Sequence, residues 1–154
     1  MNAEQLYQHN LAAIAAVSPE FAAALDALPV VGIKLLPTSE GGPTGQLWDD
    51  VTQQWVMIAH PERPAADAER IAGEIWQREP RVFCLMGLGL GHFAVAFAKR
   101  LLPHQRLGLF EPNPCLFKAS MSLVDWQPLL AQPNAQVMIG DNLGAGLEHW
   151  WLTL

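Results

Sequence analysis

The sequence lacks a concentration of positive charge. Nine Lys and Arg residues stand against fifteen Asp and Glu residues, so the 154-residue chain has a formal net charge of −6, and its basic residues form no run. A nucleic-acid-binding protein needs a basic face to replace the counterions of the phosphates, and a membrane-surface patch needs clustered Lys and Arg. We therefore expect no nucleic-acid partner and no membrane partner.

The chain is also poor in cysteine and has no export signal that we recognise. Cys84 and Cys115 are its only cysteines, too few for a disulfide framework, and we interpret both as reduced thiols in a cytoplasmic protein. The apolar run 11–17 has no basic region before it, as a signal peptide would. The uncharged stretch Val82–Ala98 touches the lower length limit of a membrane span, but its glycines favour a strand, a turn and a helix instead.

No recognised catalytic or metal-binding pattern is present. The five histidines have no metal-ligand spacing among themselves or with the cysteines. The sequence has no phosphate-binding Walker loop, no G-x-S-x-G elbow and no Cys-His signature. We therefore name no catalytic residue and expect no metal site.

The chain is instead rich in apolar residues. They make up 51% of the sequence and include six tryptophans, which indicates one globular domain with a substantial core. Residues 1–64 are predicted to form N-terminal helices and a β-hairpin packed on that core, and residues 65–154 a Rossmann-like unit. The elements expected before the Rossmann-like unit and at its start are a helix over 3–16, a helix beginning at Pro19, a strand Val30–Leu36, a hairpin of Gln46–Trp48 with Gln54–Ile58, and a helix Ala65–Arg78.

From Arg81 the pattern alternates between strands and helices. The predicted strands are Val82–Met86, Arg106–Phe110 and Gln136–Ile139. The predicted helices are Phe93–Leu102, Pro114–Ser120, Trp126–Leu130 and Leu143–Trp151. Continuous apolar strands joined by helices are typical of a parallel sheet with right-handed crossovers. We expect an α/β fold, a Rossmann-like parallel sheet with helices on both faces and Val82–Met86 as its central strand.

A glycine-rich turn follows the first of these strands. It contains Gly87, Gly89 and Gly91 and leads directly into a predicted helix. Glycine allows a tight turn and a close approach of a ligand to the backbone, and free N–H groups at a helix start favour an anion or a polar ligand edge. The turn is therefore our first candidate ligand-binding element.

Two acidic residues end the other two strands. Glu111 lies 20 residues after Gly91, and Asp141 follows the third strand. An acidic residue at such a strand end can accept hydrogen bonds from ribose hydroxyls, and parallel sheets bind ligands at this edge. Gly87, Gly89, Gly91, Glu111 and Asp141 together predict a site for a nucleotide or an S-adenosylmethionine-like ligand, whose identity the sequence leaves open.

The glycine spacing leaves the ligand class undecided. A dinucleotide fingerprint requires a third glycine at position 92, where this chain has His92. The G-x-G-x-G spacing fits a methyltransferase-type turn better, but Leu85 stands where methyltransferases usually carry an acidic residue. The contacts expected for either cofactor are thus incomplete.

Structural explanations compete with each of these functional ones. The glycines can serve only to pack the helix close to the strand. Glu111 can cap the turn that follows it, and Asp141 can be the N-cap of the last helix. His92 and His60 are more often capping or structural groups than catalysts.

Several strings, taken in order, resemble a known family. They are MIAHP at Met57–Pro61, PAADAERI at Pro64–Ile71, VFCLMGLGLGH at Val82–His92, LFEPN at Leu109–Asn113 and VMIGD at Val137–Asp141. Their order and spacing resemble the N-terminal domain of the motility-associated factor (Maf) flagellin glycosyltransferases, related to the DUF115 proteins. The resemblance covers roughly residues 5–147.

The resemblance implies a role in bacterial motility. Maf proteins are thought to transfer nonulosonic sugars from a CMP-activated donor to flagellin in the cytoplasm, and the family's catalytic region lies in a following domain. The resemblance therefore implies a non-catalytic scaffolding or partner-binding domain, with flagellin or the catalytic domain as partner. The alternatives are an S-adenosylmethionine-dependent methyltransferase-like domain and a structural assembly module. As an assembly module, the chain could form a homo-oligomer.

Overall fold

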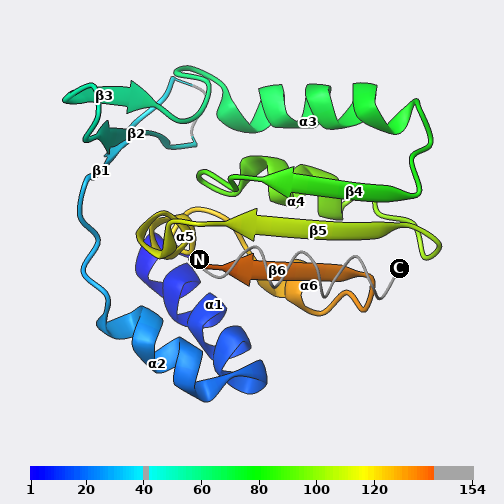
Figure 1. Ribbon diagram of the computed structural model, residues 1–154, viewed down its shortest axis with the longest axis horizontal. Coiled ribbons are helices and arrows are strands. Elements are labelled where there is room, and N and C mark those ends of the chain that lie inside the picture. The colour runs from blue at the N-terminus through cyan, green and yellow to red at the C-terminus, as the bar shows by residue number, and fades with distance from the viewer. Residues whose placement is uncertain (40–41, 141–154) are drawn as a thin grey trace.

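The fold is known from a computed structural model that describes residues 1–39 and 42–140. Figure 1 shows two helices, a small antiparallel sheet and a parallel sheet with its own helices, in that order along the chain. The elements are α1 (Ala3–Val17), α2 (Pro19–Ala27), β1 (Ile33–Leu36), β2 (Thr44–Asp49), β3 (Gln54–Met57), α3 (Pro64–Trp76), β4 (Val82–Met86), α4 (His92–Ala98), β5 (Arg106–Glu111), α5 (Pro114–Ser120), α6 (Gln127–Leu130) and β6 (Ala135–Ile139). The predicted α/β fold is confirmed.

Local sequence signals define the two N-terminal helices. Asn2 caps α1, and its side chain and that of Gln5 exchange hydrogen bonds with each other's backbone N–H groups. Ser18 caps α2, with Pro19 at the first helical position, as the sequence predicted. The Tyr7 hydroxyl donates to Asp26 at 2.7 Å and thereby joins the two helices.

The predicted hairpin is part of a three-stranded antiparallel sheet in the order β1-β2-β3. Trp48 lies opposite Trp55 in the register of β2 and β3, and their rings meet edge to face with centroids 5.4 Å apart. The first strand begins at Ile33, three residues later than expected, because Gly32 has a left-handed backbone with φ +69° that interrupts the extended chain.

The three predicted strands of the Rossmann-like unit pair in parallel, which confirms their direction. Their order is β4-β5-β6, so β5 is central and the prediction that Val82–Met86 is central was wrong. Each crossover moves the chain one strand further in the same direction. A central first strand would require the chain to return past β4, and no strand among the described residues does so.

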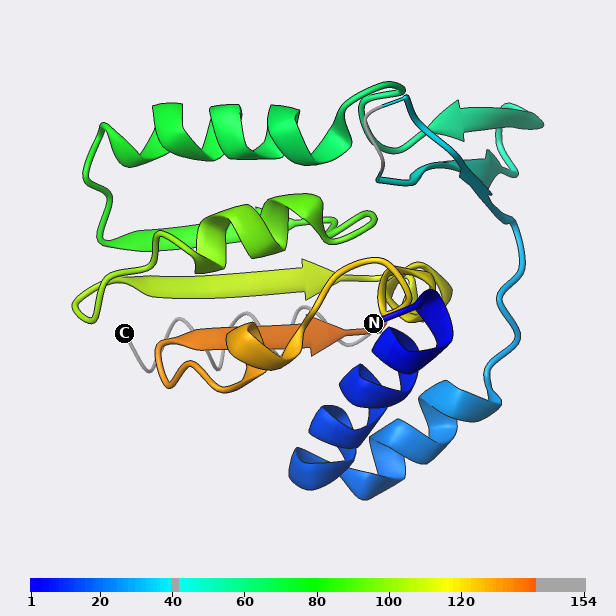
Figure 2. The same ribbon diagram turned by 180° about the vertical axis from the view of Figure 1, so that it is seen from behind.

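The two crossover helices, α4 and α6, lie on the same face of the parallel sheet. Figure 2 shows α4 in front of β4 and α6 in front of β6. The side chains on that face are buried or half-buried and belong to one core with α1, α3, α5 and α6. The prediction of helices on both faces rests on the helix expected at Leu143–Trp151, which lies outside the described residues.

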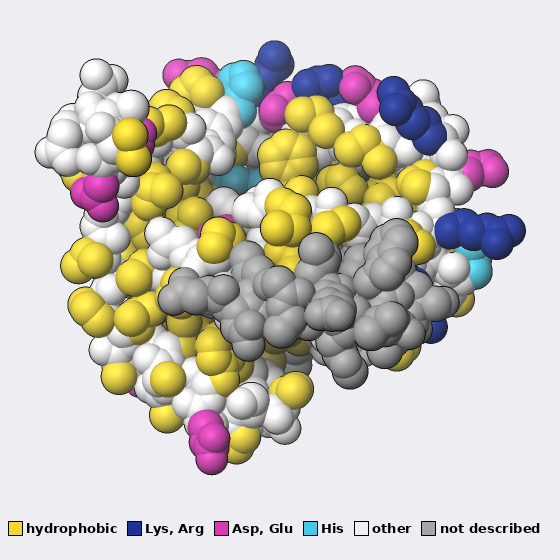
Figure 3. Space-filling view, in the orientation of Figure 1, with side chains coloured by type: hydrophobic (Ala, Val, Ile, Leu, Met, Phe, Trp, Pro, Cys, Tyr) yellow, Lys and Arg dark blue, Asp and Glu magenta, His cyan; other side chains and the backbone are white. Residues whose placement is uncertain are grey.

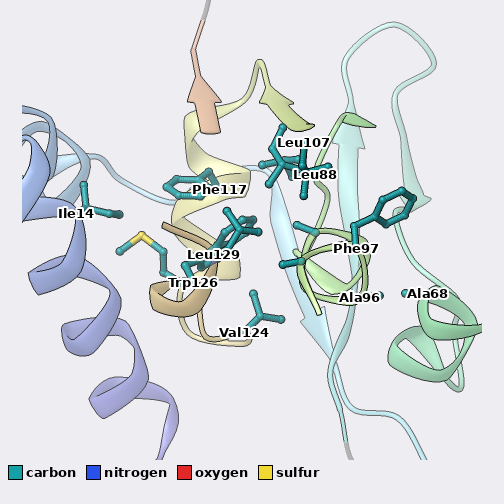
Figure 4. Close-up of a cluster of buried hydrophobic side chains, with 14 of the residues drawn as sticks. Ile14, Ala68, Leu88, Ala96, Phe97, Leu107, Phe117, Val124, Trp126 and Leu129 are labelled. Atoms are coloured by element: carbon teal, nitrogen blue, oxygen red, sulfur yellow. The ribbon is translucent and has the colours of Figure 1, made fainter. Parts of the chain in front are cut away.

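The core extends across the molecule around a single tryptophan. Trp126 is completely buried and lies in Figure 4 near Leu129 and Phe117, between Ile14 of α1 on one side and Phe97 of α4 on the other. The rings of Phe117 and Trp126 meet at a centroid distance of 5.0 Å. The division of the chain at residue 64 stays a prediction. None of the described helices is long and apolar enough to cross a membrane.

Candidate functional site

The glycine-rich turn leaves β4 and enters α4 with a backbone that favours glycine. Gly87, Gly89 and Gly91 all have positive φ, at +79°, +55° and +85°. Gly91 is the N-cap of α4. The two leucines between the glycines, Leu88 and Leu90, are each 2% exposed. The turn therefore directs its side chains into the protein and leaves its backbone as the only surface that a ligand can approach.

Glu111 meets this turn directly. The Glu111 residue is 2% exposed. Atom Oε2 accepts from the backbone N–H groups of Leu88 and Gly89, at 2.7 and 3.2 Å, and Oε1 accepts from the Asn113 N–H at 2.9 Å. The sequence thus placed the glycine turn and Glu111 together correctly. It did not predict that the contact would be direct.

The Glu111 carboxylate occupies the position of an anion on the turn. In ligand-binding turns of this kind the free N–H groups hold a phosphate or a polar ligand edge. Here two of those N–H groups donate to a buried carboxylate of the chain itself, and the third bond of that carboxylate caps the turn at Asn113. This geometry supports the structural explanation of Glu111, and its predicted role in binding a ligand stays a prediction.

Two other parts of the chain pack against the glycine turn. A Cβ atom at Gly91 would lie 2.5 Å from Val124 and 2.9 Å from Trp126, so the loop before α6 touches the backbone there. On the hairpin side, a Cβ atom at Gly45 would lie 3.1 Å from Leu90. The turn is therefore held between the antiparallel sheet and the loop 124–126.

The two histidines singled out in the sequence make backbone contacts. The Nδ1 atom of His60 accepts from the N–H groups of Glu62 and Arg63, both at 3.2 Å, just before α3 begins. His92 Nε2 lies 3.2 Å from the Pro43 carbonyl oxygen. Burial lowers the pKa of His92 more than this hydrogen bond raises it. The ring is therefore neutral at neutral pH, with its proton on Nε2 because a carbonyl only accepts.

One predicted site residue lies beyond the part of the chain that the structure describes. Asp141 lies outside the described residues, so its expected position at the carboxyl edge of the sheet stays a prediction. Among the residues that are described, no group of three or more His, Cys, Asp or Glu side chains is arranged to hold a metal ion. Asn113 was not predicted as a residue of this site. Its side chain caps α5 by accepting from the N–H groups of Cys115 and Leu116.

Replacing Glu111 with glutamine tests the carboxylate's structural role. The variant keeps the side chain's shape, but its amide nitrogen must face either Asn113 N–H or the two turn N–H groups, donor against donor. We expect Glu111→Gln to lower the free energy of unfolding by about 1–3 kcal/mol, the cost of leaving buried donors unsatisfied. Urea denaturation measures it, with Glu20→Gln on the exposed surface of α2 as a control. Equal stability of both variants would show that the bonds to Glu111 contribute nothing.

Comparison with known proteins gives one structural similarity. No family model matches the chain, and no curated protein sequence matches it. The fold is similar to that of the MAf glycosyltransferase from Magnetospirillum magneticum AMB-1, with a TM-score of 0.68 and 18% sequence identity. The match covers 97% of this chain and 29% of that chain. At this identity the similarity shows the fold, and the chain spans less than a third of the length of the enzyme it resembles.

Proposed function

We propose that this chain is the non-catalytic, Rossmann-like N-terminal domain of a Maf-type flagellin nonulosonic-acid glycosyltransferase. The observation that carries the proposal is the structural match, which includes almost all of this chain but only part of a MAf glycosyltransferase. The domain scaffolds the catalytic domain or holds flagellin or another partner in the cytoplasm. Sequence motifs that resemble the same family support it independently.

The geometry of the glycine turn supports the non-catalytic part of this proposal. Acid–base or nucleophilic catalysis needs a reactive group within hydrogen-bonding distance of an orienting partner. The buried acid at the turn, Glu111, already accepts three backbone hydrogen bonds. His92 is bonded to a backbone carbonyl and has a lowered pKa. Both groups are thus engaged in holding the fold.

We predict that the 154-residue chain alone transfers neither a sugar nor a methyl group. The assay incubates the purified chain with flagellin and a CMP-activated nonulosonic sugar, and separately with labelled S-adenosylmethionine, and looks for the added mass by mass spectrometry. A complete Maf glycosyltransferase serves as the positive control for sugar transfer. Sugar transfer by the chain alone would overturn the proposal. Methyl transfer abolished by Glu111→Ala would favour the methyltransferase-like alternative.

We further propose that any small-molecule ligand of this domain lies at the carboxyl edge of the parallel sheet, between the Gly87–Gly91 turn, Glu111 and Asp141. Calorimetric titration with S-adenosylmethionine, NAD and CMP tests this. If one of them binds, we expect Gly89→Val to abolish its affinity, because a side chain at Gly89 (φ +55°) strains the turn where the ligand must approach. Circular dichroism checks that the variant is folded. Unchanged affinity in a folded variant would place the ligand elsewhere.

A further inference from the structure

Strand β4 lies at one edge of the parallel sheet and has an unpaired side. The Arg106 N–H donates to the Arg81 carbonyl and the Gly87 N–H to the Phe110 carbonyl, so the odd-numbered residues of β4 turn their backbone groups toward β5. The N–H and C=O groups of Val82, Cys84 and Met86 therefore point away from β5. No strand in the described part of the chain pairs with them.

The sequence of this edge strand has none of the features that usually discourage further pairing. Natural edge strands carry a lysine, a proline or a bulge that discourages another strand. The sequence VFCLM of β4 has no charge and no proline, and its five residues pair with β5 in unbroken register. Val82 and Met86 are 38% and 57% exposed, and Cys84 is exposed as well. Figure 3, in the orientation of Figure 1, shows hydrophobic side chains gathered directly below α3.

Helix α3 lies beyond the same edge. Figure 1 shows it running alongside β4 on the side away from β5. Its last residue, Trp76, stacks on Phe83 of β4 with ring centroids 3.9 Å apart, whereas Ile71 and Ile75 remain half-buried. The helix thus extends past the sheet, and a strand added next to β4 would lie against its apolar side.

Chain handedness indicates the direction of the added strand. The order β4-β5-β6 places both described crossovers on one face, as right-handed connections require. A doubly wound sheet continues on the other side of its first strand, with parallel strands and crossovers on the opposite face. The Gly87–Gly91 turn at the end of β4 would then lie at the topological switch point, where such sheets bind ligands.

We propose that the outer edge of β4 receives a fourth strand, parallel to β4, from the part of a larger Maf-type glycosyltransferase that lies outside these 154 residues. The proposal rests on the proposed function for the source of the strand. A second copy of this chain is a poor occupant. Two β4 edges would pair antiparallel about an axis normal to the sheet, and the α4 helix of one copy would enter the space of α3 of the other.

The experiment fuses an added strand to the chain and measures whether the outer edge of β4 becomes protected. A seven-residue strand of alternating Thr and Val is fused to the carboxyl end through a flexible Gly/Ser linker of about 20 residues, which spans roughly 25 Å. The matched control fusion has proline at alternate positions of the strand. Amide hydrogen exchange by NMR follows Val82, Cys84 and Met86, and alkylation of the Cys84 thiol follows access to the same edge. In a second arm, the remainder of the Magnetospirillum enzyme is added as a separate polypeptide.

In the chain alone, we expect the three edge amides to exchange fast and those of Phe83 and Leu85, which face β5, to exchange slowly. The fused strand and the added remainder should each slow the edge amides about tenfold or more and slow the alkylation of Cys84. The proline control should change neither. Slow exchange of the edge amides in the chain alone, or no protection by the fused strand, would overturn the proposal that this edge is open to another strand. Protection by the fused strand but not by the remainder would overturn the proposed source. These readouts need no sugar transfer, so they fail independently of the proposed function.

Discussion

Replacement of Gly91 by alanine is expected to be the most damaging alanine substitution among the three turn glycines. The new Cβ atom would lie 2.5 Å from Val124 Cγ2 and 2.9 Å from Trp126 Cζ2, and Trp126 is fully buried and cannot move aside. The left-handed backbone costs about 1–2 kcal/mol for an L-residue, and overpacking costs about 1–3 kcal/mol more. We therefore expect the free energy of unfolding to fall by about 2–5 kcal/mol.

Gly87→Ala is the matched control for this substitution. Gly87 has nearly the same backbone, with φ +79°, but nothing lies within 4 Å of its Cβ position. Only the backbone cost of about 1–2 kcal/mol is expected there. Urea denaturation of both variants separates the packing contribution from the backbone contribution. Equal losses in the two variants would mean that the loop 124–126 yields without cost.

Local sequence patterns predicted most of the secondary structure because the signals are themselves local. Ser18 and Pro19 define the start of α2 through one cap and one fixed backbone angle. The order of the parallel strands depends instead on how the crossovers pack. The apolar run of Val82–Met86 resembles that of a central strand, although Val82 and Met86 are exposed at an edge. Burial on both faces cannot be distinguished from burial on one face when every side chain in the strand is apolar.

The candidate site was predictable in position but not in chemistry. Parallel strands end at the same edge of a sheet, so the spacing of Gly87–Gly91 and Glu111 was enough to bring them together. Whether the Glu111 carboxylate faces a ligand or the chain's own N–H groups depends on its side-chain rotamer. No pattern of residue types along the sequence specifies that rotamer. The contact between the turn and the loop 124–126 could not be predicted from the sequence either. It joins segments more than thirty residues apart, and it depends on how their shapes fit together.

The substitution Asn10→Asp is expected to destabilise the protein by about 3–5 kcal/mol, the range for leaving a buried charge without its partner. Asn10 is fully buried in α1. Its amide nitrogen donates to the carbonyls of Met121 and Val124, and its oxygen accepts from the Trp126 N–H, all at 2.8 Å. Aspartate would place a charged oxygen against two carbonyl oxygens. These bonds hold the loop that packs on Gly91, so we expect the loss of stability to extend to the glycine turn. Amide hydrogen exchange at Gly91 measures this effect.

Asn2→Asp makes the same chemical change where it should do no harm. Asn2 is exposed at the N-cap of α1, and its side chain only accepts, from the Gln5 N–H. A carboxylate is an equally good cap beside the positive end of the helix, within about 0.5 kcal/mol. The pH dependence provides a second check on the Asn10→Asp variant. Burial among carbonyl oxygens raises the pKa of the new carboxyl above its unfolded value of about 3.9. Between these two pKa values the folded variant binds more protons than its unfolded chain. The loss in its free energy of unfolding relative to the wild type is therefore complete above the raised pKa and becomes smaller as the pH falls toward about 4. A deficit that stays constant over this range would show that the new carboxyl reaches water, and that the three hydrogen bonds of Asn10 do not enclose it.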